Sequence, residues 1–415
     1  MKKFIAVMLC LALTVSVFTG CTTTPPAGNS TNSPAPGGSS DAGSAPGGSG
    51  DTIKIGIFEP ASGENGGGGK QEALGIRYAH SLVPTVEVGG KTYKVELVEV
   101  DNQSDTSKAV TAAQSLVSSG VSVVLGSYGS GVSIAAGEIF REAKIPAIGV
   151  SCTNPQVTLG NDYYFRICFL DPFQGTVMAS FAQSKGAKKA FVITQLGDDY
   201  STGLGNYFKS AFEAAGGAVV TGEFQTGEVD FNAILTNAKN ENVDVIFAPS
   251  SIATAPLIIQ QARQLGITCP IMAGDTWENQ SIIDNAGADT SEVYLSTFFD
   301  ENDSSNTIAK DFVTGYKAWL NSDNQNLTNN GGNDGVAAVS ALGYDAYMTA
   351  IEAIKAAGAP DAASIQAALP GVSYDGVTGG LTFDENGDAK KNMAYIKTID
   401  NDNGGFKFIQ TQTVS

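Results

Sequence analysis

The sequence predicts an α/β protein with two doubly wound, Rossmann-like lobes that are joined by a hinge of three chain crossings. Three observations lead to this fold class. Apolar strand patterns alternate with helix patterns from residue 51 onward, the alternation restarts near residue 188, and the 415-residue chain is longer than one hydrophobic core normally serves. Strands that alternate with helices favour parallel sheets covered by helices on both faces.

The chain begins with a short targeting pattern. Two lysines precede the apolar run FIAVMLCLALTVSVF at positions 4–18, which is typical of a secretory signal and is too short to span a bilayer comfortably. The next residues, Thr19-Gly20-Cys21, resemble a bacterial lipobox, although Phe18 stands where that motif usually has leucine. We therefore expect a signal peptide over 1–20 and lipidation of Cys21. The alternatives are a plain signal with a chance cysteine and an uncleaved anchor.

A linker follows the cysteine. Residues 21–51 are rich in Gly, Pro, Ser and Thr and contain no large apolar side chain, so they cannot bury enough surface to offset chain entropy. We expect this segment to tether the folded part to a membrane and hold it at a distance. Two acyl chains on a cysteine are enough for stable attachment.

The first lobe is predicted over 52–171 plus 301–384. Its first series of elements alternates regularly, and a Gly-rich loop separates the first strand from the first helix. The expected strands are at 51–60, 93–101, 121–126 and 145–150, and the expected helices are at 71–82, 106–119, 131–144, 306–320 and 335–358.

The second lobe is predicted over 172–300 plus 385–415. Its expected strands are at 188–196, 218–224, 243–248 and 270–274, and its expected helices are at 200–215, 231–242 and 254–265. The last segment, 379–411, has strand patterns joined by Gly, Asn and Asp turns, which indicates antiparallel pairing. We place the three crossings near 171–174, 299–302 and 384–390.

Composition excludes several function classes. The net charge of −18 argues against nucleic-acid binding, because phosphate contacts need a basic face. The chain has one histidine, His80, which leaves little room for histidine-dependent nucleophilic catalysis. Besides Cys21, the cysteines of the exported part show no metal-binding spacing; Cys152 and Cys168 could pair, but free buried thiols are favoured. The Gly-rich segment 63–72 fails the phosphate-loop pattern at both ends. We expect no metal, no cofactor and no enzymatic activity.

The fold class also predicts where a ligand binds. In open α/β sheets, ligands lie beyond the carboxyl ends of the strands, where loops lead into helix N-termini. This rule selects the loops 59–70, 127–131, 151–155, 196–202, 249–254 and 275–279.

Several segments resemble one family, the type I periplasmic solute-binding proteins of branched-chain amino acid uptake. The resemblance covers the whole chain after the linker. Its carrying segments are IKIGIFEPASG, VVLGSYGSGVSIAAGEIFREAKIPAIGVSCTNP, YYFRICFLDPFQG, DDYSTGL, IIQQARQLGI and GLTFDENGD. The resemblance implies a monomeric lipoprotein on the extracytoplasmic face of the cell membrane. It would capture a neutral amino acid, a branched-chain one above all, and deliver it to the permease and ATPase subunits of an ABC importer.

Candidate ligand-binding residues lie in the selected loops. A zwitterionic amino acid needs neutral donors for its carboxylate, and the hydroxyls of Ser130 and Thr153 and the backbone around Ser151 offer them near helix N-termini. Its ammonium needs an acid, which Asp275 supplies; in the family pattern an acid of the second lobe has this role. Tyr200 matches a cleft tyrosine of the family. The alternatives are that Ser130, Thr153 and Asp275 only cap helices and that Tyr200 only packs.

One departure leaves the ligand's side chain open. Relatives that bind aliphatic side chains usually carry an aromatic residue where this chain has Ser251. Tyr128 and Trp277 are the candidates to line the side-chain pocket instead. Other ligands on the same fold would be an amide, urea, a small carboxylate or an aromatic acid, and a further alternative is a lipoprotein that senses its ligand for a signalling partner.

Overall fold

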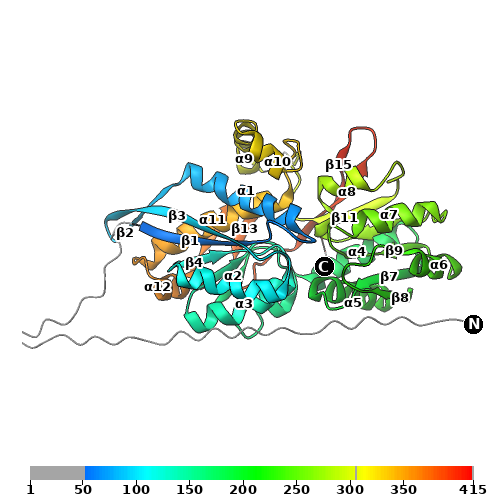
Figure 1. Cartoon of the computed structure of the whole chain (residues 1–415), viewed down its shortest axis with the longest axis horizontal. Helices are drawn as coiled ribbons and strands as arrows, with labels where there is room; N and C mark the ends of the chain where they lie inside the picture. The colour runs from blue at the N-terminus through cyan, green and yellow to red at the C-terminus, as the bar shows by residue number, and fades with distance from the viewer. Residues whose placement is uncertain (1–51, 304–305, 414–415) are drawn as a thin grey trace, which may run out of the picture. The chain divides into compact units, whose positions relative to one another are not determined.

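The computed structural model describes residues 52–303 and 306–413, so Cys21 and the predicted signal and linker lie outside the described residues (Figure 1). The described chain forms two large sheets flanked by helices, with a small hairpin. This mixed α/β architecture confirms the predicted fold class. Within the described residues, no helix has the length and apolar character that a membrane span requires.

The first sheet has six strands in the order β2-β3-β1-β4-β5-β6. All neighbouring strands are parallel except β2 and β3, which pair antiparallel. The strands are β1 Thr52–Glu59, β2 Thr85–Val88, β3 Lys91–Asp101, β4 Val123–Leu125, β5 Ala147–Gly149 and β6 Tyr164–Arg166.

Helices cover both faces of this sheet (Figure 1). Successive side chains of a strand point to opposite faces, and in β4 Val123 and Leu125 join one buried cluster while Val124 joins the other. The first cluster includes side chains of α1 and α11, and the second includes side chains of α2 and α3. The helices associated with this sheet are α1 Gly66–Leu82, α2 Thr106–Ser118, α3 Ser130–Ala143, α11 Ala338–Ala357 and α12 Ala362–Ala368.

The second sheet has seven strands in the order β15-β14-β11-β10-β9-β7-β8. Strands β7 to β11 are parallel, whereas β14 and β15 are added antiparallel at one edge, as the turn-rich end of the sequence predicted. The strands are β7 Lys189–Gln195, β8 Ala218–Phe224, β9 Val245–Phe247, β10 Ile271–Ala273, β11 Val293–Thr297, β14 Met393–Asp400 and β15 Gly405–Thr413. Helix α4 Asp171–Ser184 precedes its first strand, and the helices between its strands are α5 Asp199–Ala214, α6 Asn232–Asn240, α7 Ala255–Gln264 and α8 Gln280–Asn285.

The chain passes between the two sheets three times. It leaves the first sheet after β6, leaves the second after β11, and returns to the second at β14. The remaining elements lie between the last two passages: α9 Thr307–Leu320, α10 Asn324–Asn329, α11, α12 and the hairpin of β12 Ser373–Gly376 and β13 Gly379–Thr382. The residue limits of the two lobes stay a prediction.

Helix α1 starts earlier than the sequence predicted. It begins at Gly66, within the glycine run that we assigned to a loop, and not near Gln71. A Cβ atom on Gly68 would lie 2.3 Å from the Tyr128 ring, and one on Gly69 would lie 2.3 Å from the Pro60 carbonyl oxygen. The glycines therefore let the first turn of α1 pack directly on its neighbours. This tertiary contact outweighs the low helix propensity of glycine.

The cysteines of the described part carry no disulfide. Cys152 and Cys168 are buried free thiols, and Cys269 is a half-buried one. Burial raises the pKa of the Cys152 thiol to about 11, which keeps it protonated and unreactive at neutral pH.

Candidate functional site

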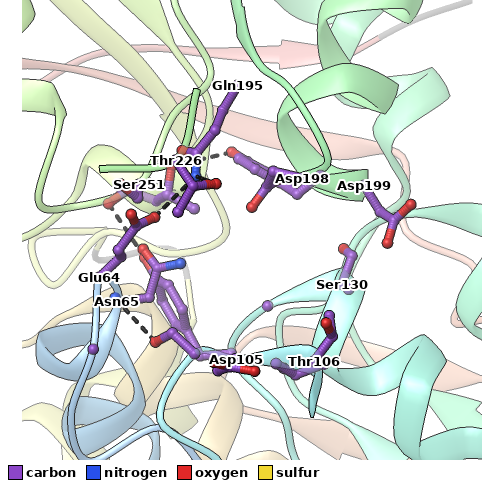
Figure 2. Close-up of a pocket in the computed structure, with 18 of the residues that line it drawn as sticks. Glu64, Asn65, Asp105, Thr106, Ser130, Gln195, Asp198, Asp199, Thr226 and Ser251 are labelled. Atoms are coloured by element: carbon purple, nitrogen blue, oxygen red, sulfur yellow. Dashed lines mark hydrogen bonds between the residues drawn. The ribbon is translucent and has the colours of Figure 1, made fainter. Parts of the chain in front are cut away.

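A cavity of about 390 Å³ lies at the carboxyl ends of strands from both sheets (Figure 2). Loops after β1, β4, β5, β7, β9 and β10 contribute to it, and these are the loops that the carboxyl-end rule selected. The loop after β3, residues 103–106, and Thr226 after β8 also line it, and the sequence analysis missed both. The same rule would have found them if it had been applied to every strand.

Ser130 lies at the N-terminus of α3, and its hydroxyl lines the cavity. The preceding Gly129 has a φ of 122°, in the region that favours glycine, and this turn leads the chain into the helix. The Ser130 Oγ accepts a hydrogen bond from the Asn154 backbone N–H at 3.1 Å. It does not cap α3, since no side chain caps that helix, and it can still donate its own proton to a ligand.

Ser151 connects the cavity to a buried pair of acids. Its hydroxyl donates a hydrogen bond to Glu72 of α1, and Glu59, at the end of β1, is a second buried acid whose pKa is raised in part by the charge of Glu72. Both acids are buried, and burial disfavours the charged form of a carboxylate. Burial raises the pKa of Glu72 to about 8 and that of Glu59 well above its ordinary value. The second oxygen of Glu59 accepts from the Tyr128 N–H at 2.7 Å, so the acid pair also positions the 128–132 loop.

Asp275 lies on the opposite wall of the cavity, in a short 3-10 helix, Asp275–Trp277. Its Oδ1 accepts from the Gln174 side chain at 2.8 Å and from the Tyr200 hydroxyl at 3.1 Å. Burial raises its pKa to about 6, so it is ionised at neutral pH. The N-cap of the following helix α8 is Asn279, so Asp275 does not cap it.

The other predicted residues divide into two groups. Tyr128 and Tyr200 both line the cavity, and the Tyr128 hydroxyl donates to the Thr276 carbonyl oxygen at 3.2 Å. Thr153 and Trp277 are buried but are not among the residues that line it, and the Trp277 indole donates to Ser250 at 3.3 Å. Contact of these two with a ligand stays a prediction.

Glu278 is a second buried acid, three positions after Asp275 in the sequence. It pairs with Lys397 at 2.6 Å and with the Thr297 hydroxyl. It is also absent from the cavity lining, so it is no rival to Asp275 as the acid that faces the ligand.

A polar group that the sequence analysis missed completes the lining. Gln195 donates from Nε2 to Glu64 at 3.0 Å and to Thr226 at 3.1 Å. Asn65 accepts from the Ile252 N–H at 3.0 Å. In Figure 2, Glu64, Asn65, Gln195, Thr226 and Ser251 gather on one side of the space, across from Ser130 and Asp199.

The lining is acidic. Its carboxylates are Glu64, Asp105, Asp198, Asp199 and Asp275, and it includes no Lys, Arg or His among the residues that the structure describes. Burial raises the pKa of Asp198 to about 6 and that of Asp199 above its ordinary value. Such a surface attracts groups that donate hydrogen bonds or carry positive charge.

Comparisons with known proteins agree with this geometry. The family model described as "Periplasmic binding protein" matches residues 52–404. A leucine-, isoleucine-, valine-, threonine- and alanine-binding protein of Pseudomonas aeruginosa is 29% identical over 82% of this chain and 88% of its own length.

Two solved structures are similar over almost their whole length. The leucine-binding protein LivK of Thermotoga maritima is 35% identical with a TM-score of 0.80, over 87% of this chain and 99% of that one. LivJ of Streptococcus pneumoniae, a branched-chain amino acid transporter substrate-binding protein solved with isoleucine, is 31% identical with a TM-score of 0.77, over 88% and 99%.

Proposed function

Because this chain belongs to the periplasmic binding protein family, we propose that it captures an amino acid outside the cytoplasm for an ABC importer. The relatives named above are amino acid-binding proteins, which supports a binding role for this chain. The observation that carries the proposal is that Asp275, Ser130 and Ser151 line one cavity.

The cavity has the two parts that a zwitterion needs. The Ser130 hydroxyl and the backbone around Ser151, with the N-terminal N–H groups of α3, would hold the ligand carboxylate. No basic side chain is required, because a helix N-terminus already carries partial positive charge. Asp275, oriented by Gln174 and Tyr200, would accept the ligand ammonium. The carboxylate would lie on the first sheet's side and the ammonium on the second sheet's side.

A ligand screen tests this function. Thermal-shift measurements of the purified protein against the twenty amino acids should show stabilisation by at least one, since a ligand that binds only the folded state raises stability by RT ln(1 + [L]/Kd). Calorimetry would then give the affinity. The same screen includes urea, short amides, small carboxylates and benzoate. If one of these stabilises the protein and no amino acid does, the amino acid assignment is wrong.

We further propose that the protein is a lipoprotein anchored at Cys21, acting as a monomer with permease and ATPase subunits. The support is the sequence of the signal region and the linker. Cys21→Ser should leave ligand binding intact but release the protein from the membrane fraction. If the serine variant stays in that fraction as firmly as the wild type, the lipid anchor is refuted.

A further inference from the structure

One acceptor in the cavity has no partner. The side chain of Gln195 lines the cavity and is 2% exposed, and its Oε1 has no hydrogen-bond partner among the described residues. A buried acceptor without a donor costs free energy, so such atoms in native proteins usually meet a donor. The direction of this amide therefore bears on what the cavity accepts.

The orientation of the Gln195 amide is determined by its neighbour. A carboxylate accepts hydrogen bonds and cannot donate, so the group that faces Glu64 must be the NH₂ group. The same NH₂ group also donates to Thr226, which uses both of its hydrogens. Rotating the amide would place its oxygen against the Glu64 carboxylate. Oε1 is therefore the amide atom that has no hydrogen-bond partner, and it can accept a hydrogen bond from a ligand.

Several acceptors line the cavity together with Gln195. Glu64 accepts a hydrogen bond from it, and Asp198 and Asp199 lie where the loop after β7 leads into α5. Ser251 lines the same cavity with a small polar side chain. An aliphatic ligand side chain would leave these polar groups desolvated without hydrogen bonds, which is unfavourable.

We infer that the ligand's side chain ends in an N–H donor, on an ammonium, guanidinium or amide group, that meets Gln195 and Glu64. This inference rests on the proposed amino acid function and names the substrate class within it. The α-carboxylate and α-ammonium would occupy the Ser130 and Asp275 ends, and the distal nitrogen would reach the Gln195 end. The ligand would then be a polar or cationic amino acid and not a branched-chain one.

Matched ligand pairs test the inference by calorimetry. Lysine is compared with norleucine, which has the same chain without the terminal nitrogen, and glutamine and arginine are compared with leucine and isoleucine. Among the amino acids with a side-chain nitrogen, we expect the best ligand to bind at least about tenfold more tightly than any aliphatic amino acid, because its side chain donates to buried acceptors. Lysine against glutamine distinguishes a charged from a neutral donor. The inference would be overturned if leucine, isoleucine or norleucine bound more tightly than every amino acid with a side-chain nitrogen.

A variant separates recognition from a structural role. Gln195→Met keeps the length of the side chain but removes the acceptor. It should weaken binding of the ligand with a side-chain nitrogen about tenfold or more, and so reduce the difference in affinity between that ligand and its aliphatic counterpart. Gln183→Met is the matched control, because Gln183 only donates to Ala215 on the surface. An equal loss for both ligands of a pair would show that Gln195 acts only on the fold of the site.

Amines without an α-carboxylate distinguish failure of this inference from failure of the proposed function. One outcome is that agmatine or cadaverine binds, that Gln195→Met weakens this binding, and that no amino acid binds. The Gln195 subsite would then be supported and the amino acid function refuted. If neither amines nor amino acids bind, both are refuted.

Discussion

Tyr200 donates its hydroxyl hydrogen to Oδ1 of Asp275 over 3.1 Å, and this bond orients the acid on the cavity wall. Gln174 donates to the same oxygen from helix α4. Three separate parts of the chain thus meet at one carboxylate. Neutral donors hold Asp275 in place without cancelling its charge, which leaves that charge available for the ligand ammonium that we propose it binds.

Replacing Asp275 by asparagine should weaken amino acid binding by at least about tenfold, because a hydrogen bond to a charged group contributes about 1.5–3 kcal/mol. The change keeps the shape and removes the charge. Calorimetry on the variant measures the loss. Asp311→Asn is the control, since Asp311 is an exposed acid on α9 away from the cavity. Binding within twofold of the wild type would show that Asp275 does not hold the ammonium.

Binding should also weaken as the pH falls through about 6. The pKa of Asp275 is raised to about 6 by burial, and only its ionised form attracts the ammonium. At pH 5, one unit below this pKa, only about a tenth of the Asp275 side chains are ionised. The affinity at pH 5 should therefore be about tenfold lower than at pH 8. The pKa of Asp198 is also about 6, so Asp275→Asn serves as the control. A profile that keeps the same slope in that variant would assign the pH effect to another group.

Glu72 should make the protein less stable as the pH rises. Its pKa is about 8 in the folded chain, against 4.5 ordinarily, so between these values the folded state binds a proton that the unfolded state has released. Stability therefore declines from about pH 4.5 to 8 and the loss is complete above pH 8. Glu59 acts in the same direction, because its pKa is also raised.

Glu72→Gln tests this linkage, because glutamine imitates the protonated acid. The variant should gain thermal stability relative to the wild type at pH 8.5, by at least about 2 °C, and show little gain at pH 4.5. Glu142→Gln, at an exposed position of α3, should show no such difference. Parallel melting profiles of Glu72→Gln and the wild type across this range would contradict the assignment.

Gly75 allows α1 and α11 to approach each other. A Cβ atom there would lie 1.9 Å from the Ser340 carbonyl oxygen, and backbone cannot yield as a flexible side chain does. Gly75→Ala should lower the free energy of unfolding by about 1–3 kcal/mol or more, measured by denaturant titration. Gly371→Ala is the matched control, because a Cβ at Gly371 meets nothing within 4 Å. Equal stability of the two variants would refute the packing argument.

Most of the fold could be predicted because it depends on local periodicity. The alternation of strands and helices, the restart at the second sheet and the antiparallel edge at β14 and β15 all follow from patterns within short windows. The start of α1 could not be predicted, since the close packing of its glycines involves Tyr128, which is about 60 positions away in the sequence, as well as nearby Pro60.

The sequence by itself determined the family, the α/β class and the loops that surround the cavity, because strand ends and helix starts are local features. Tertiary structure decided which side chains meet there. Glu72 faces Ser151 across 79 positions, and Gln195 faces Glu64 across 131. Such pairs depend on sheet order and on burial, which sets the protonation of Glu72 and leaves Gln195 Oε1 without a donor. Periodicity carries no information about either pair, so the contacts at the Gln195 end of the cavity could be identified only from the tertiary structure.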